Sequence, residues 1–294
     1  MSSNGRTLVS GTSNWGSSPC IRTMKYTKIL IYSLISLSLL ITGILYIYNT
    51  DSKSIEPTKI PFQIINKYPH STNSYTQGLF FDGDTLYEST GSPSYLPQTE
   101  SVLGILDLET GKIDTKVKLD RDIYFGEGST ILKDKIYQLT YKNQKGFVYD
   151  AKTFEQIQTF EFESKEGWGL TNDSANLIMS DGTDKITYLD TDNFTAIRQI
   201  SVKYQNSPQY NLNELEYVAG YIYANIYQTN KIVKINPDNG EILGVLDLSD
   251  IVAQAREKSS NIAELNGIAY RESTETFFIT GKLWPYIYEL KLQN

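Results

Sequence analysis

Gln77-Gly78-Leu79 opens the first of five similar apolar runs along this chain of 294 residues. The other four open at Glu127-Gly128-Ser129, Trp168-Gly169-Leu170, Asn213-Glu214-Leu215 and Asn266-Gly267-Ile268. In each opening a polar or bulky residue stands beside or just before a small turn, and a strand-like run follows. The openings are about 50, 41, 46 and 52 residues apart. Repeats of this length, made only of strands and turns, are typical of propeller blades with variable loops.

Each repeat continues with two further apolar runs, such as Lys135-Ile136-Tyr137 and Phe147-Val148-Tyr149-Asp150 in the second repeat. Alternating β-branched and aromatic residues are what half-buried antiparallel strands need. The turns at Asp82-Gly83, Thr110-Gly111 and Asp238-Asn239-Gly240 supply residues that tolerate positive φ, which lets hairpins close. We therefore expect an all-β fold: a five-bladed β-propeller of four-stranded antiparallel blades.

The segment Pro61–Pro69 precedes the first repeat and alternates like a strand. Pairing with the last blade would close the ring and remove a sheet edge, the feature that makes open sheets prone to aggregation. This reasoning assigns residues 61–294 to one propeller domain.

Residues 29–48 form an uncharged stretch, long enough as a helix to cross a hydrocarbon core of about 30 Å. Arg22, Lys25 and Lys28 precede it and Asp51 follows, so the positive-inside rule places the N-terminus in the cytoplasm and the repeats outside. The sequence thus predicts a basic segment over 1–28, a transmembrane signal-anchor over 29–48 and a linker over 49–60. A cleaved signal, which would release the propeller by secretion, is the alternative, and Met24 is a second candidate start.

Charge and cysteine content limit the partners of the chain. Its net charge is −7, and the four basic residues of Met1–Lys28, which has no acidic residue, leave −11 for the remainder. An acidic domain has no electrostatic footprint for nucleic acid. The single cysteine, Cys20, precedes the apolar span, so the repeats form no disulfide. We expect a monomer that contacts the membrane only through its N-terminal helix.

The innermost strands of a propeller line a channel whose mouth binds small ligands. The residues that open the repeats converge there, together with Lys282 and Trp284 of the fifth repeat. His70 is the only histidine, so neither a Ser-His-Asp triad nor a multi-histidine metal site can form. Walker and dinucleotide-binding motifs are absent from the sequence. What remains suits acid–base chemistry on a neutral polar substrate.

The chain resembles the plant- and bacterial-type glutaminyl-peptide cyclotransferases from Phe62 to Leu292. The matching motifs occur in the same order and are 75–79 (YTQGL), 88–91 (ESTG), 125–128 (FGEG), 167–170 (GWGL), 213–216 (NELE), 228–229 (QT), 265–269 (LNGIA) and 280–285 (TGKLWP). The resemblance implies a five-bladed propeller enzyme that converts the N-terminal glutamine of a peptide or protein into pyroglutamate and releases ammonia. No cofactor is required; a structural calcium ion is compatible with the sequence but is not indicated by it.

In this chemistry the α-amine of the substrate attacks its own side-chain carboxamide, and no covalent enzyme intermediate is needed. We assign proton transfer to Glu127 and stabilisation of the carboxamide oxygen to Lys282 and Asn213. The resemblance implies the same roles. The expected substrate-binding residues are Gln77, Tyr75, Phe125, Tyr141, Trp168, Tyr227, Trp284 and Asn266. Three of them, the tyrosines, stand where the family often has Phe or Trp, which leaves the preferred second residue of the substrate open.

Without the resemblance, the residues are also compatible with two other functions. One is a non-catalytic propeller that displays a binding surface, and the other is a propeller hydrolase with a channel-bound calcium ion. Taken singly, a glutamate beside a glycine is usually a solvated edge residue. The prediction for Glu127 therefore rests on its place in the repeat and on the resemblance. Glu88 and Glu216 are interpreted as hydrogen-bonding struts between blades, and alternation places Glu214 on the strand face opposite Asn213.

Overall fold

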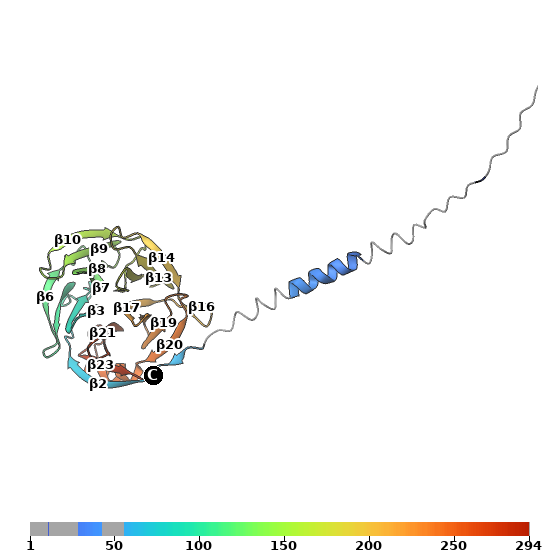
Figure 1. Ribbon diagram of the computed structural model, residues 1–294. Helices are drawn as coiled ribbons and strands as arrows, with labels where there is room; N and C mark the ends of the chain where they lie inside the picture. Colours follow the sequence, from blue (N-terminus) through green and yellow to red (C-terminus); the bar gives the residue numbers. More distant parts are fainter. Residues whose placement is uncertain (1–10, 12–28, 43–55, 294) are drawn as a thin grey trace, which may run out of the picture. The chain divides into compact units, whose positions relative to one another are not determined.

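The computed structural model describes residue 11, residues 29–42 and residues 56–293 of the chain (Figure 1). The chain divides into two units, Met1–Ser54 and Ile55–Asn294. In the first unit, residues 29–42 are helical. The predicted apolar span continues to residue 48, so its last six residues lie outside the described residues. Nearly all of the predicted basic segment and most of the predicted linker also lie outside them. Within the described ranges, no helix has the length and apolar character needed to cross a membrane.

The second unit is a ring of five antiparallel blades (Figure 1). Blade 1 contains β3 (Thr76–Asp82), β4 (Thr85–Thr90), β5 (Val102–Asp107) and β6 (Lys112–Lys118). Blade 2 contains β7 (Gly126–Leu132), β8 (Lys135–Thr140), β9 (Lys145–Asp150) and β10 (Gln156–Glu161). Blade 3 contains β11 (Leu170–Asn172), β12 (Leu177–Ser180), β13 (Lys185–Leu189) and β14 (Ala196–Ser201). The first strand of each is the innermost.

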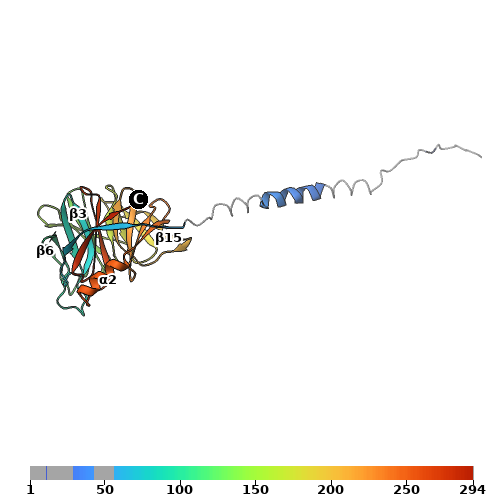
Figure 2. The ribbon, with the colours of Figure 1, turned by 90° about the horizontal axis from the view of Figure 1, so that it is seen from below.

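Blades 4 and 5 carry the additions to this plan. Blade 4 contains β17 (Leu212–Val218), β18 (Tyr221–Ile226), β19 (Lys231–Ile235) and β20 (Ile242–Asp247), with β1 (Thr58–Lys59) parallel to β20 at its outer edge. Blade 5 contains β21 (Leu265–Arg271), β22 (Thr276–Gly281), β23 (Tyr286–Leu292) and, outermost, β2 (Phe62–Pro69). A hairpin of β15 (Lys203–Tyr204) and β16 (Ser207–Pro208) precedes blade 4, and helix α2 (Ser249–Lys258) follows it on one face of the ring (Figure 2).

Strand β2 closes the ring, as the sequence predicted. It pairs antiparallel with β23, from Phe62 opposite Leu292 to Pro69 opposite Tyr286. The predicted linker is one detail that needs correction, because Thr58–Lys59 within it already pairs with blade 4. The propeller therefore begins before residue 61. Closure pairs β2, near the start of the second unit, with β23 at its end, and completes the last blade with a fourth strand.

The recurring glycines in the strand openings explain how the innermost strands approach each other. A Cβ on Gly128 would lie 2.5 Å from the amide nitrogen of Leu170, and one on Gly169 would lie 2.1 Å from the carbonyl oxygen of Asn213. Neither position has room for a side chain. Gly128 instead donates its N–H to the carbonyl of Trp168 at 2.7 Å. These contacts hold neighbouring blades together at the channel.

The outer hairpins of four blades share one type of turn, and the sequence predicted only the two cases that end in glycine. In the turn after β9, the Asp150 carboxylate accepts the backbone N–H groups of Lys152 and Thr153, both at 2.9 Å. Phe154 ends this turn at φ 60°, and Phe194 ends the corresponding turn of blade 3 at φ 59°, where blades 1 and 4 have glycine. The Phe194 ring stacks on Phe160 with centroids 4.3 Å apart. Packing of the ring offsets the strain of this left-handed conformation.

Candidate active site

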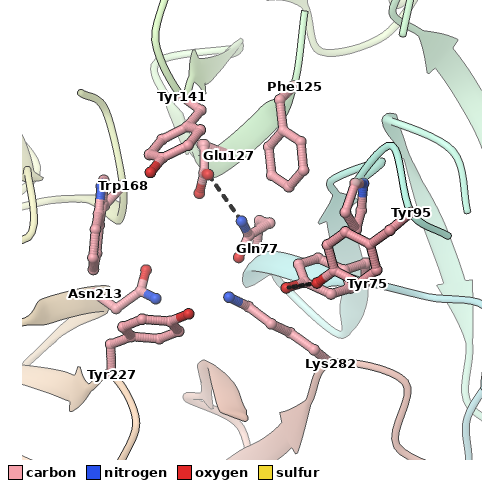
Figure 3. Close-up of a pocket in the computed structure, with 11 residues that line it drawn as sticks. Tyr75, Gln77, Tyr95, Phe125, Glu127, Tyr141, Trp168, Asn213, Tyr227 and Lys282 are labelled. Carbon is pink, nitrogen blue, oxygen red and sulfur yellow. Dashed lines mark hydrogen bonds between the residues drawn. The ribbon is translucent and has the colours of Figure 1, made fainter. Parts of the chain in front are cut away.

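The residues that open the repeats meet at one end of the channel because the five innermost strands begin there. Gln77, Glu127 and Asn213 are each the second residue of their strands β3, β7 and β17. Trp168 lies two residues before β11, and Lys282 lies in the turn between β22 and β23. They surround a pocket of about 210 Å³ (Figure 3). Its lining is formed by Tyr75, Gln77, Pro93, Tyr95, Phe125, Glu127, Tyr141, Trp168, Asn213, Tyr227 and Lys282.

Two residues predicted to bind substrate do not line the pocket. Trp284 is fully buried and donates its indole N–H to the carbonyl of Ala263 at 3.0 Å, because the chain turns at Leu283 with φ 63°. Asn266 is also fully buried and donates its side-chain amide to Gln77 Oε1 at 3.0 Å. Trp284 is a core residue under the Lys282 turn, and Asn266 orients a pocket residue from behind. The other nine predicted residues all line the pocket.

Pro93 and Tyr95 line the pocket but were not predicted. They lie in the segment between β4 and β5, residues 91–101, which we call the rim loop. No position in the repeat corresponds to them. The one signal in the sequence is an aromatic residue between two prolines, Pro93 and Pro97, in a long connection between two strands.

Four polar side chains form the floor of the pocket and are nearly inaccessible: Gln77, Glu127, Asn213 and Lys282 are exposed by only 3–4%. Gln77 Nε2 donates to Glu127 Oε1 at 2.8 Å (Figure 3), while Gln77 Oε1 accepts from Asn266. These two hydrogen bonds, both donated by side-chain amides, fix one oxygen of the Glu127 carboxyl group. Of the ion pairs within the described part of the chain, none joins Glu127 to Lys282. Both side chains line the pocket.

Burial shifts the two ionisable groups of the floor toward their neutral forms. Loss of solvent raises the pKa of Glu127 well above its ordinary value, opposed by the positive charge of Lys282 and the hydrogen bond from Gln77. Loss of solvent likewise lowers the pKa of Lys282, opposed by the negative charges of Glu127 and Glu264. A carboxyl group whose pKa is raised in this way holds a proton more readily than an ordinary glutamate does, which suits a group that must accept a proton and return it.

Aromatic rings form the walls of the pocket. The Lys282 ammonium lies 4.9 Å from the ring centroids of both Tyr75 and Tyr227, within the range of cation–π attraction. Trp168 packs edge-on against Tyr227, with centroids 5.5 Å apart, and its indole N–H is held by Glu166 at 3.0 Å. Low polarity around the floor strengthens electrostatic interactions there.

Three further carboxylates lie in the ring but outside the pocket. Glu216 on β17 accepts the backbone N–H of Tyr270 in blade 5 at 2.9 Å and the hydroxyl of Thr171 in blade 3 at 3.3 Å. Glu88 lies between His70, which follows the closing strand, and Thr76. Both match the predicted struts.

Glu214 joins three blades. Its two carboxylate oxygens accept the backbone N–H groups of Leu79 in blade 1, at 3.3 Å, and Ile268 in blade 5, at 2.7 Å. Among the residues with described positions, none of the carboxylates, histidines or cysteines gather in groups of three or more that could hold a metal ion.

Comparisons with known proteins give a consistent result. The family model described as glutamine cyclotransferase matches residues 37–292. A glutaminyl-peptide cyclotransferase from Arabidopsis thaliana is 36% identical over 235 residues, which cover 79% of this chain and 71% of the relative. The crystal structure of Myxococcus xanthus glutaminyl cyclase superposes with a TM-score of 0.74 at 33% identity, covering 81% of this chain and 99% of that one.

Proposed function

The chain belongs to the glutamine cyclotransferase family, and we propose that the pocket of Figure 3 is where it acts as a glutaminyl-peptide cyclotransferase. The reaction converts the N-terminal glutamine of a peptide into pyroglutamate and releases ammonia. Family membership favours this activity over the binding module and the calcium-dependent hydrolase that the sequence alone left open. It also indicates no cofactor.

The observation that carries the assignment of the site is that Glu127 and Lys282 both lie, buried, on the floor of one pocket with aromatic walls. The substrate's α-amine nitrogen forms a bond to its own carboxamide carbon, which becomes tetrahedral. Glu127 takes a proton from that amine through the oxygen that Gln77 leaves free. It then returns the proton to the carboxamide nitrogen as the carbon–nitrogen bond breaks and ammonia departs.

Negative charge develops on the carboxamide oxygen in the tetrahedral state. Lys282 and the side-chain amide of Asn213 point into the same part of the pocket (Figure 3), where they would donate hydrogen bonds to that oxygen. The aromatic walls would hold the glutaminyl chain folded, with its amine near its carboxamide. Because the attack is intramolecular, this restriction of freedom lowers the barrier by several kcal/mol, about the range seen for well-oriented reactions.

The test of the function is ammonia release from a synthetic peptide that begins with glutamine, followed together with the loss of one ammonia from the peptide mass. We expect activity with the full-length chain on Gln-Gly peptides. A peptide with acetylated glutamine, whose amine cannot attack, is the matched control and should release no ammonia. Equal release from both peptides would show side-chain deamidation in place of cyclisation.

We also propose that residues 29–48 anchor a monomeric enzyme in a membrane and that the propeller faces away from the cytoplasm. The support is the uncharged stretch and the basic residues before it. Extraction of membranes with alkaline carbonate should leave the full-length chain in the pellet, and protease added from the cytoplasmic side should spare the propeller. Recovery in the secreted fraction would favour the cleaved signal.

A further inference from the structure

Tyr95 is the most exposed side chain in the pocket lining. Tyr95 is 72% exposed, whereas Tyr75, whose hydroxyl lies 3.5 Å from that of Tyr95, is only 7% exposed. Exposure thus rises from the polar floor, through the partly buried walls, to Tyr95 at the mouth. Figure 3 shows Tyr95 on the side of the pocket opposite Trp168. An exposed aromatic face at the mouth of an aromatic pocket is available to a ligand that extends outward.

The rim loop holds Tyr95 in place. Arg121, which precedes blade 2, donates to the carbonyls of Pro97 at 3.0 Å and Thr99 at 3.2 Å. At the base of the loop, the buried hydroxyls of Ser92 and Ser101 lie 2.8 Å apart. A ring presented by a fixed loop loses little freedom on binding, which is why such rings contribute strongly to recognition.

The reaction itself decides which part of a substrate meets Tyr95. The reacting amine and carboxamide both belong to the first residue and must reach Glu127 and Lys282 on the floor. The peptide bond then leads outward, so the side chain of the second residue emerges at the mouth. Resting on the function proposed above, we propose that Tyr95 and the rim loop form a subsite for that second side chain, and that it takes aromatic or bulky aliphatic residues.

The test uses peptides that differ only at the second position: Gln-Phe, Gln-Leu and Gln-Gly with the same remaining sequence. With the full-length chain we expect kcat/KM to be about 3- to 10-fold higher for Gln-Phe than for Gln-Gly, the size of one aromatic pair. The difference should lie mainly in KM, because the contact is made equally in the ground and transition states. Tyr95→Ala should abolish most of this preference, and Tyr95→Phe should keep it.

Two further variants separate the subsite from general effects. Tyr210→Ala removes a tyrosine that is 56% exposed but does not line the pocket, and it should leave the preference unchanged. Arg121→Gln loosens the rim loop and should reduce the preference without touching the substrate. Equal rates for Gln-Phe and Gln-Gly in the unmodified enzyme, or an equal loss for both peptides in Tyr95→Ala, would overturn the subsite. Absence of ammonia from every peptide would overturn the proposed function and the subsite with it.

Discussion

Glu127 at the pocket floor and Glu214 in the channel wall are the same residue type on the same kind of strand. Both are buried on innermost strands, and burial raises the pKa of both. They differ in what their oxygens contact. Glu214 accepts one backbone N–H from each of two other blades. Glu127 accepts one side-chain amide and faces the pocket with its other oxygen.

The comparison shows that burial alone does not mark a catalytic carboxyl group. A carboxylate whose oxygens are both satisfied by backbone donors ties strands together, and its proton has no route to a ligand. A carboxylate with one free oxygen, facing a lysine across a pocket, can exchange a proton with whatever enters. Each of the following variants tests one side of this contrast.

Glu127→Gln should have the largest effect. Gln keeps the volume of the side chain but cannot shuttle a proton, so kcat for ammonia release should fall by about 10²- to 10⁴-fold. The midpoint of thermal unfolding should not change. Glu216→Gln is the matched control, because it alters a largely buried carboxyl of the channel in the same way; it should keep most of the activity. If Glu127→Gln retains most of its rate, the proton shuttle is another group.

Lys282→Gln should lower kcat by about 10²- to 10³-fold, because a neutral amide stabilises a developing oxyanion less than an ammonium does. The pH profile adds a second test. Burial lowers the pKa of Lys282 below its usual value of 10.5, so activity of the unmodified enzyme should fall on the alkaline side as this group loses its proton. The variant should lack that alkaline limb. Lys67→Gln is the control. Lys67 lies on the outer strand β2, with its Nζ 4.3 Å from the ring centroid of Tyr286, and its replacement should leave the pH profile of activity unaltered.

Glu214→Ala should mainly affect stability. It leaves the backbone N–H groups of Leu79 and Ile268 buried without an acceptor, so the free energy of unfolding should fall by at least about 2 kcal/mol, measured by urea denaturation. Glu214→Gln retains one acceptor oxygen and should lose less. An alanine variant as stable as the unmodified protein would mean that Glu214 is not a strut.

Glu216→Gln should change the pH dependence of stability. Burial raises the pKa of Glu216 from 4.5 to about 8, so the folded state binds this proton more tightly than the unfolded state does. Stability therefore declines as pH rises from about 4.5 to 8, by at most about 1.4 kcal/mol per pH unit for this group. The variant cannot ionise and should show a shallower decline between pH 5 and pH 8 in urea titrations. An unchanged slope would refute the assignment.

The sequence predicted the ring because each feature of the repeat involves residues that are close together in the chain. These features are an opening residue, a glycine where strands approach each other, and alternating apolar residues. It predicted that Gln77, Glu127 and Asn213 lie together because equivalent positions of a propeller converge on one axis, and it added Lys282 from the end of the fifth repeat. It failed at Trp284, since the backbone reverses at Leu283 and sends that ring into the core. It also failed at Tyr95, because the rim loop has no counterpart in the other repeats.

By itself the sequence determined the number of blades, the closure by β2 and the set of polar residues at the channel mouth. Only the tertiary structure showed that Glu214 is bound through both oxygens by backbone N–H groups of two other blades, whereas Glu127 accepts one side-chain amide. The hydrogen bonds that make this distinction join residues far apart in the chain: Gln77 and Glu127 are 50 positions apart, and Gln77 and Asn266 are 189. Local patterns carry no information on such partners, and the loss of solvent that raises the pKa of Glu127 arises only when the ring is closed.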